Sequence, residues 1–302
     1  MRSYYVKRKS YFFSIERKRR KRRTIGLAVF VALAAALFYV GTQGPYQPDL
    51  KKKALKDQTE KASVAVQKQQ SPEQQLPPEG GAKVAIVIDD VGYIQTYVGE
   101  FQKTKIPLTF SVLPHSRYGK AHAELFHSLG QEIILHLPME NNLSQSSYGP
   151  GEISTKMSDE QIIEVLRGDL EFVPQAKGMN NHEGQAATTD LRVMRTVINY
   201  CQDHNLFFLD SLTTSQSVAS QVQEEVGMSK RVNDWFIDNR DEAEEVKRQI
   251  QKLGDLAKKD GVAIGIGHIQ RANTAKAIQE MAPVLESQGV QFVFLSQIPG
   301  NR

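Results

Sequence analysis

Acidic residues, histidines and asparagines follow six short apolar runs in this sequence. The six polar endings are Asp89-Asp90, His136, Asn181-His182, Asp210-Ser211, Asp238-Asn239 and His268. Asp is a good helix N-cap, and capping would be sufficient to explain Asp210 taken alone. Capping does not explain six endings on six different runs, because a carboxylate or imidazole beside a buried segment has a desolvation cost. The pattern therefore predicts a functional cluster.

The chemistry of these residues points to a metal ion. Aspartate and histidine together form a ligand set that suits Zn²⁺ and tolerates other divalent ions of the first transition row. The one cysteine, Cys201, falls on an apolar helical stripe, so we expect a core residue and no cysteine-based zinc site. A carboxylate left over beside a bound metal could act as general base on water, and a further histidine could act as acid.

The elements that must position this cluster are expected to be strands alternating with helices. Short apolar runs and amphipathic stretches alternate from Lys83 onward, which is typical of β-α units and a parallel sheet. The expected strands cover residues 84–88, 108–113, 132–137, 177–180, 206–209, 232–237, 262–266 and 292–295. Helices are expected between them; one starts at the capping box Ser158-x-x-Gln161 and another stops near Gly261.

This alternation predicts an α/β fold with a single barrel-like domain. The about 220 residues from Lys83 onward are sufficient for one sizeable core. In a barrel of parallel strands, the carboxyl ends of the strands meet on one face, where the active sites of this architecture lie. The six polar endings are therefore expected to lie close together.

The first 82 residues differ from the rest of the chain. Residues 1–23 hold eleven Lys/Arg and one acid, a charge of +10, whereas the remainder holds 27 bases and 33 acids, a charge of −6. Residues 25–40 carry no charge, and with their flanks they are about as long as a short membrane-spanning helix. The sequence thus predicts a basic cytoplasmic tail at 1–23, a transmembrane signal-anchor helix at 24–42, a flexible linker at 43–82 and the folded domain at 83–302.

This topology predicts a single-pass protein of the inner (cytoplasmic) membrane, with its folded domain in the periplasm or outside the cell. A cleaved signal peptide, which would release a secreted domain, is the alternative. The excess of basic charge belongs to the tail, so the folded domain is not expected to bind nucleic acid.

Five motifs resemble the divergent polysaccharide deacetylases, a family distantly similar to the NodB-like carbohydrate deacetylases. In chain order they are Val87-Ile88-Asp89-Asp90-Val91-Gly92, His136-Leu137-Pro138-Met139-Glu140, Gly178-Met179-Asn180-Asn181-His182-Glu183-Gly184, Phe208-Leu209-Asp210-Ser211 and Gly265-Ile266-Gly267-His268. The resemblance covers about Lys83 to Ile298. It implies a distorted (β/α) barrel that removes acetyl groups from an N-acetylated glycan, such as peptidoglycan or a surface polysaccharide, with a divalent metal for which Zn²⁺ is the first candidate.

The resemblance also implies roles for individual residues. Asp89 corresponds to the catalytic base, Asp90 and His136 to metal ligands, and His268 to the general acid. Further polar residues are expected to orient His268 or to bind sugar hydroxyls. These are Asn181, Asp210 and Asp238.

The third metal ligand is left open by the sequence. The NodB-like motif His-x-x-x-His here reads His136-x-x-x-Glu140, so the third ligand is either Glu140 or His182. His182 is favoured because it restores an Asp-His-His set, which leaves Glu140 with a supporting or substrate-binding role.

Two functions from different classes follow from these patterns. The first is a metal-dependent envelope hydrolase that deacetylates a glycan, or a hydrolase with another C–N or ester bond as its target. The second is a non-catalytic envelope module that binds metal and glycan. It is favoured by the His-to-Glu change at Glu140 and by the absence of the Arg-x-Pro-Tyr motif of the NodB-like deacetylases. The presence of Asp89, Asp90 and His268 favours the enzyme, because a binding module has little use for both a base and an acid.

Overall fold

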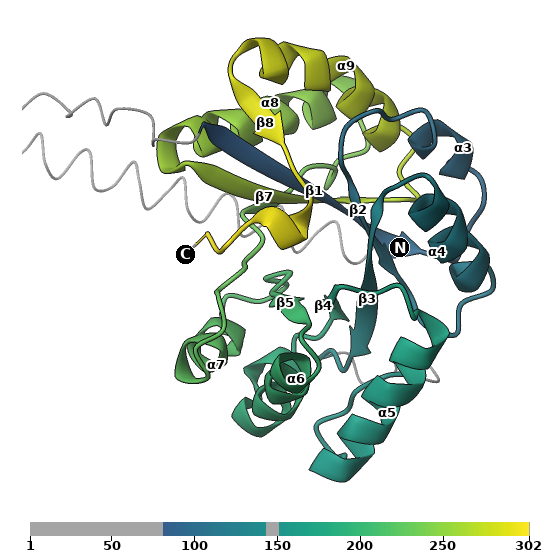
Figure 1. Cartoon of the computed structure of the whole chain (residues 1–302), viewed down its shortest axis with the longest axis vertical. Helices are drawn as coiled ribbons and strands as arrows, with labels where there is room; N and C mark the ends of the chain where they lie inside the picture. The colour runs from purple at the N-terminus through teal and green to yellow at the C-terminus, as the bar shows by residue number, and fades with distance from the viewer. Residues whose placement is uncertain (1–80, 143–150, 302) are drawn as a thin grey trace, which may run out of the picture. The chain divides into compact units, whose positions relative to one another are not determined.

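The computed structural model describes residues 81–142 and 151–301, which form an α/β domain (Figure 1). The predicted basic tail, transmembrane helix and linker up to residue 80 lie outside the described residues. Among the described residues, no helix has both the length and the apolar character that a membrane crossing requires. The first strand begins at Ala82, which the sequence assigned to the end of the linker.

Eight parallel strands alternate with helices along the described chain. The strands are β1 (Ala82–Val91), β2 (Thr109–Val112), β3 (Glu132–Met139), β4 (Gly178–Glu183), β5 (Phe207–Leu209), β6 (Trp235–Phe236), β7 (Val262–His268) and β8 (Val290–Phe292). The helices are α3 (Val98–Phe101), α4 (Gly119–Ser128), α5 (Asp159–Phe172), α6 (Leu191–Asp203), α7 (Ala219–Glu225), α8 (Ala243–Asp260) and α9 (Thr274–Ser287), with the 3-10 helices η1 (Ala187–Thr189) and η2 (Leu295–Gln297).

The strands form one curled sheet with the helices around its outside (Figure 1). Their order is β5-β4-β3-β2-β1-β7-β6, and β8 pairs with the start of β1. An isolated bridge between Asp210, after β5, and Val232, before β6, links the two ends of this order. The fold is therefore a curled parallel half-barrel, and at its edges a single bridge replaces the strand-to-strand ladder of a regular barrel.

Two expected strands differ from those observed. The run 232–237 forms a strand only at Trp235–Phe236, because the Asp234 carboxylate accepts the hydrogen bond of Ile264 N at 2.8 Å. The last strand ends at Phe292, and Leu295 begins η2 instead. The expected capping box at Ser158 and Gln161 and the helix end at Gly261 are both confirmed.

Successive strand residues face two different hydrophobic clusters. Val84, Ile86 and Ile88 of β1 face the larger cluster, which the helices cover. Ala85 and Val87 face a smaller cluster inside the curled sheet. The other members of this inner cluster are Ile134, Phe207, Leu209, Ile264, Ile266, Val293, Leu295 and Ile298.

The same alternation carries polar residues to the other end of the sheet interior. Asp89 follows Val87 on the inner face of β1, His136 follows Ile134 on β3, and His268 follows Ile266 on β7. Asn180 and His182 occupy the corresponding inward positions of β4, since Met179, directly before Asn180, belongs to the outer cluster. The carboxyl ends of the strands thus carry polar side chains into a common space.

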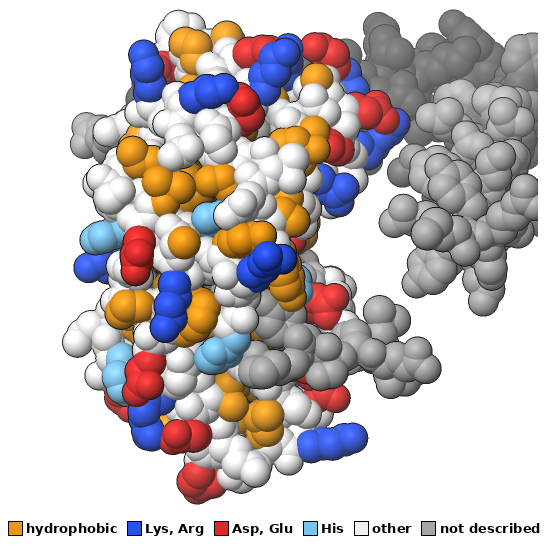
Figure 2. All heavy atoms as spheres, turned by 90° about the vertical axis from the view of Figure 1, so that its right-hand side faces the viewer, with side chains coloured by type: hydrophobic (Ala, Val, Ile, Leu, Met, Phe, Trp, Pro, Cys, Tyr) orange, Lys and Arg blue, Asp and Glu red, His pale blue; other side chains and the backbone are white. Residues whose placement is uncertain are grey.

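The outer surface over α3, α4 and α5 is of mixed character. Figure 2 shows this face, where Lys and Arg side chains are interspersed with Asp and Glu side chains and with apolar groups. Cys201 is buried on α6, which confirms its expected place in the core.

Candidate metal centre

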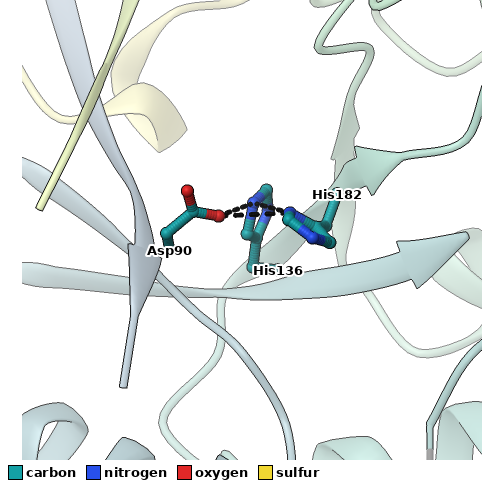
Figure 3. A group of neighbouring side chains, drawn as sticks. All are labelled: Asp90, His136 and His182. Carbon is teal, nitrogen blue, oxygen red and sulfur yellow. Dashed lines mark hydrogen bonds and ion pairs between the residues drawn. The ribbon is translucent and has the colours of Figure 1, made fainter. Parts of the chain in front are cut away.

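Three side chains from three strands of the sheet converge at this polar end. Asp90 of β1, His136 of β3 and His182 of β4 point toward one another (Figure 3). Asp90 Oδ1 lies 3.2 Å from His136 Nε2 and 3.1 Å from His182 Nδ1, and the two nitrogens lie 3.2 Å apart. Donor atoms that surround a tetrahedral zinc ion at its usual bond lengths lie roughly 3.3 Å from one another. The three atoms therefore have the spacing of a metal ligand set.

The backbone at Asp90 places two adjacent carboxylates on the same side of β1. Neighbouring residues of a regular strand point to opposite faces. Asp90 instead has a left-handed φ of 62°, and the β1–β2 register shifts between Ile88 and Val91. As a result both Asp89 and Asp90 approach His136 Nε2, at 3.7 and 3.2 Å. Asp tolerates this conformation better than most residues, and such conformations concentrate at functional sites.

The donor set fits a divalent cation on chemical grounds. Asp90 Oδ1 is buried and accepts no hydrogen bond from the described residues, although the two imidazole nitrogens lie close to it. Burial opposes its ionisation, but the adjacent His136 and His182 hold the pKa of Asp90 well below its usual range. Gln270 Nε2 donates to the other carboxylate oxygen, Oδ2. An ionised oxygen is thus left facing two imidazoles, as a metal ion requires.

Asp89 lies beside this group but remains outside it. Its side chain is buried, and its two oxygens accept hydrogen bonds from Asn180 Nδ2 at 3.0 and 3.2 Å. Burial raises the pKa of Asp89 above its ordinary value, against the opposite pull of His136 and His268. The carboxylate is therefore positioned to accept a proton next to the three-residue group.

His268 forms a second polar pair on the neighbouring strand. Its Nδ1 lies 2.7 Å from Asp238 Oδ1, and the other oxygen, Oδ2, accepts from His268 N and from Thr274 Oγ1. Burial disfavours the imidazolium, yet the hydrogen bond to Asp238 raises the pKa of His268 to about 9. The ring is stacked near Phe236, with centroids 5.7 Å apart. This arrangement keeps His268 protonated at neutral pH and fixes its orientation.

The family model of the divergent polysaccharide deacetylases matches residues 86–298 of this chain. The chain belongs to this family. An uncharacterized protein of Haemophilus influenzae is 34% identical over 198 residues, which cover 66% of this chain and 70% of that protein. The uncharacterized protein YibQ of Escherichia coli is 31% identical over 204 residues, covering 68% of this chain and 63% of YibQ, less than two thirds of its length.

The fold also resembles a solved structure. The crystal structure of an uncharacterized protein from Agrobacterium tumefaciens superposes with a TM-score of 0.68 and 20% sequence identity. The superposition covers 72% of this chain and 88% of that protein. At this identity the likeness concerns the fold alone.

In this member of the family, the structure brings His182 rather than Glu140 to the group that could hold a metal. The Glu140 carboxylate instead accepts hydrogen bonds from Thr155 N, Thr155 Oγ1 and Ser154 Oγ, at 2.6, 2.7 and 3.0 Å. These bonds lower the pKa of Glu140, with the Thr155 hydroxyl as the largest cause. Glu140 thus holds Ser154 and Thr155, which lie shortly before α5.

Of the three residues expected to orient His268 or to bind sugar, Asp238 is the one that contacts it. Asp210 Oδ1 accepts from Leu212 N at 2.8 Å, and Asn181 Oδ1 accepts from Ser211 N at 2.8 Å. Both side chains are therefore engaged in shaping the loop after β5. Within the described residues, the hydrogen bonds of these two side chains go to the loop after β5 and not to His268. That Asp210 and Asn181 bind sugar hydroxyls stays a prediction.

Three polar residues at the site were not singled out from the sequence. These are Ser111, Asn180 and Gln270. Asn180 was counted as part of an expected strand, although its position two residues before His182 places both side chains on the same face. Gln270 lies in an exposed loop, where its residue type and spacing gave no signal.

Proposed function

We propose that this domain is a metal-dependent hydrolase of the cell envelope that removes acetyl groups from an N-acetylated glycan, such as peptidoglycan or a surface polysaccharide. The observation that carries the proposal is the juxtaposition of a base and an acid beside the candidate metal ligands. Asp89 and His268 are register partners on β1 and β7. Membership of the divergent polysaccharide deacetylases supports the substrate class.

The proposed ligands are Asp90 Oδ1, His136 Nε2 and His182 Nδ1. A divalent ion, with Zn²⁺ favoured by the donor set, would supply Lewis acidity that activates water and polarises the amide carbonyl. The chain itself supplies the proton transfers. Asp89 accepts a proton from the water that attacks the carbonyl carbon. As the C–N bond breaks, His268 donates a proton to the leaving nitrogen, so that acetate and an amine are formed.

Asp238 supports the acid in two ways. It binds His268 Nδ1, so that Nε2 is the nitrogen left to donate a proton toward the substrate. It also stabilises the imidazolium by its charge. The predicted N-terminal anchor would place this chemistry on the non-cytoplasmic side of the membrane, where envelope glycans occur.

Acetate release tests the proposal. The purified full chain is incubated with chitooligosaccharides or peptidoglycan fragments in the presence of Zn²⁺, Co²⁺ or Ni²⁺. We expect release by the wild type, and at least about a 100-fold lower rate for Asp89→Asn and for His268→Gln, with metal content unchanged. Asp255→Asn, an exposed carboxylate on α8, is the control and should behave as wild type. Glycan binding without release under any metal would contradict the enzyme and favour a binding module.

A further inference from the structure

Asn180 joins the proposed base to one of the proposed metal ligands. It is fully buried on β4. Its Oδ1 lies 2.9 Å from His136 Nδ1 and accepts from Ser111 Oγ. Its Nδ2 donates to both oxygens of Asp89 and to Ser211 Oγ at 3.0 Å. One amide therefore contacts both Asp89 and His136, with hydroxyls from two further parts of the sheet around it.

The chemistry of the neighbours fixes which way the amide points. An ionised Asp89 can only accept hydrogen bonds, so the Asn180 atom beside it must be the NH₂ group. The carbonyl oxygen then faces His136 Nδ1, which must carry a proton to bond to it. With Nδ1 protonated, the lone pair of a neutral His136 lies on Nε2. Nε2 is the atom that faces Asp90 Oδ1 and His182 Nδ1.

We propose that Asn180 is a positioning residue with two separate tasks, an inference that rests on the proposed metal site. Its carbonyl sets the His136 tautomer so that Nε2 is free to bind metal. Its NH₂ group holds the Asp89 carboxylate in place beside that metal. Metal-binding histidines usually donate their second nitrogen to a carboxylate, a backbone carbonyl or water. A carboxylate at position 180 could accept the hydrogen bond of His136, but it could not donate one to Asp89 and would repel it.

The loop after β5 keeps Asn180 in position. Ser211 Oγ donates to Asn181 O at 2.9 Å and accepts from Asn180 Nδ2. Ser211 N is itself held by Asn181 Oδ1. Ser211, the second residue of the polar ending after β5, thus serves the site through Asn180.

Two substitutions separate the two tasks of Asn180. Zn²⁺ affinity of the full chain is measured by competition with a chelator for the wild type, Asn180→Ala and Asn180→Asp. Asn180→Ala loses the acceptor for His136, so affinity should fall about 10- to 100-fold. Asn180→Asp keeps an acceptor, so its affinity should be at least about tenfold tighter than that of Asn180→Ala. Acetate release should fall in both variants through kcat, because neither can donate to Asp89.

Asn199→Ala removes an exposed asparagine from α6, outside the site, and is the matched control. It should keep wild-type Zn²⁺ affinity and activity. Wild-type affinity in Asn180→Ala, or equal losses in Asn180→Ala and Asn180→Asp, would overturn the tautomer role. A wild type that binds no Zn²⁺ would refute the proposed metal site itself, an outcome that differs from failure of the Asn180 inference alone.

A direct measurement on the wild type keeps the inference testable if Asn180→Ala does not fold. Nitrogen NMR of the Zn²⁺-loaded chain with ¹⁵N-labelled histidine reports the protonation of each ring. We expect His136 to carry its proton on Nδ1 and to bind Zn²⁺ through Nε2. A proton on Nε2 would overturn the inference, whether or not the protein turns out to be active.

Discussion

The two ends of the space inside the curled sheet have opposite character, although the same strands build both. At the amino-terminal end, β1 contributes Ala85 and Val87 to the inner hydrophobic cluster. At the carboxyl-terminal end, the next inward residue of β1 is Asp89, which is buried and surrounded by polar side chains. One alternation of residues therefore builds a hydrophobic core at one end and a polar site at the other.

The apolar end is completed by the C-terminal segment. Leu295 and Ile298 enter the inner cluster from beyond β8. Their segment is held at the start of β2 and β3, because Leu295 N donates to Thr109 Oγ1 at 3.1 Å and Ser296 N donates to Glu132 Oε1 at 3.1 Å. The last turn of the described chain thus closes the end of the sheet opposite the site.

The polar end is stabilised by hydrogen bonds and ion pairs instead of apolar packing. Asp89, Asn180 and His136 form one connected network, and His268 and Asp238 form another. Buried groups of this kind have a desolvation cost, which is offset only where each finds a partner. The apolar end therefore supplies stability, so that the polar end can keep groups suited to chemistry.

The largest expected effect tests the polar end. His182→Ala removes a proposed metal ligand, so Zn²⁺ affinity should fall by at least about 100-fold. Mutation of a residue that only orients a ligand already lowers metal affinity by about 10- to 100-fold. Glu140→Gln should bind Zn²⁺ like the wild type, because Glu140 is held by Ser154 and Thr155. Isothermal titration calorimetry measures both variants. The reverse result, with loss in Glu140→Gln alone, would make Glu140 the third ligand.

The second prediction tests the apolar end. Leu295→Ala empties part of the inner cluster, where Leu295 is fully buried, and should lower the free energy of unfolding by about 2–5 kcal/mol. Zn²⁺ affinity of the folded variant should stay at the wild-type value. Urea denaturation followed by circular dichroism measures the first quantity and calorimetry the second.

Leu129→Ala is the matched control for Leu295→Ala, since it removes the same atoms from a leucine that is 48% exposed. Its free energy of unfolding should change by no more than about 0.5 kcal/mol. A large loss of Zn²⁺ affinity in folded Leu295→Ala would break the proposed separation between the two ends.

Much of the strand arrangement was predictable because buried parallel strands are apolar runs that stop at polar residues. That pattern located β1, β3 and β7 together with the polar residues that the structure brings together. Apolarity alone could not separate a strand from a core-filling segment, so the run around Leu295 was assigned to the last strand although it forms η2.

The site was less predictable where it depends on contacts between distant strands. The left-handed backbone at Asp90 arises from a shift of register between β1 and β2, which the sequence of β1 does not reveal. Asn180 acquires its partners from β1, β2, β3 and the loop after β5, so its position could be inferred only from the period of β4. His182 was favoured as the third ligand on chemical grounds. The hydrogen bond from Thr155 to Glu140 could not be predicted from the sequence.

The smallest expected effect concerns the pKa of His268 in the metal-free protein. NMR titration of the wild type should give a value of about 9. Asp238→Asn removes the charge bonded to the ring, so this pKa should fall by at least about one pH unit. The charges of Asp89 and Asp90 also raise the pKa of His268, so part of the elevation should remain in Asp238→Asn. Asp255→Asn, at an exposed position of α8, should leave the pKa of His268 unchanged.

The same pair makes stability depend on pH in a defined direction. Because the folded state raises the pKa of His268 above its ordinary 6.5, the ion pair stabilises the fold fully below pH 6.5, and this contribution is lost as pH rises through about 9. The difference in unfolding free energy between wild type and Asp238→Asn should therefore be largest near pH 6 and shrink by pH 10. Urea denaturation at these two pH values measures it. A difference that grows with pH would mean that His268 is neutral in the fold, and the polar end would then lack the proton donor that the proposed reaction requires.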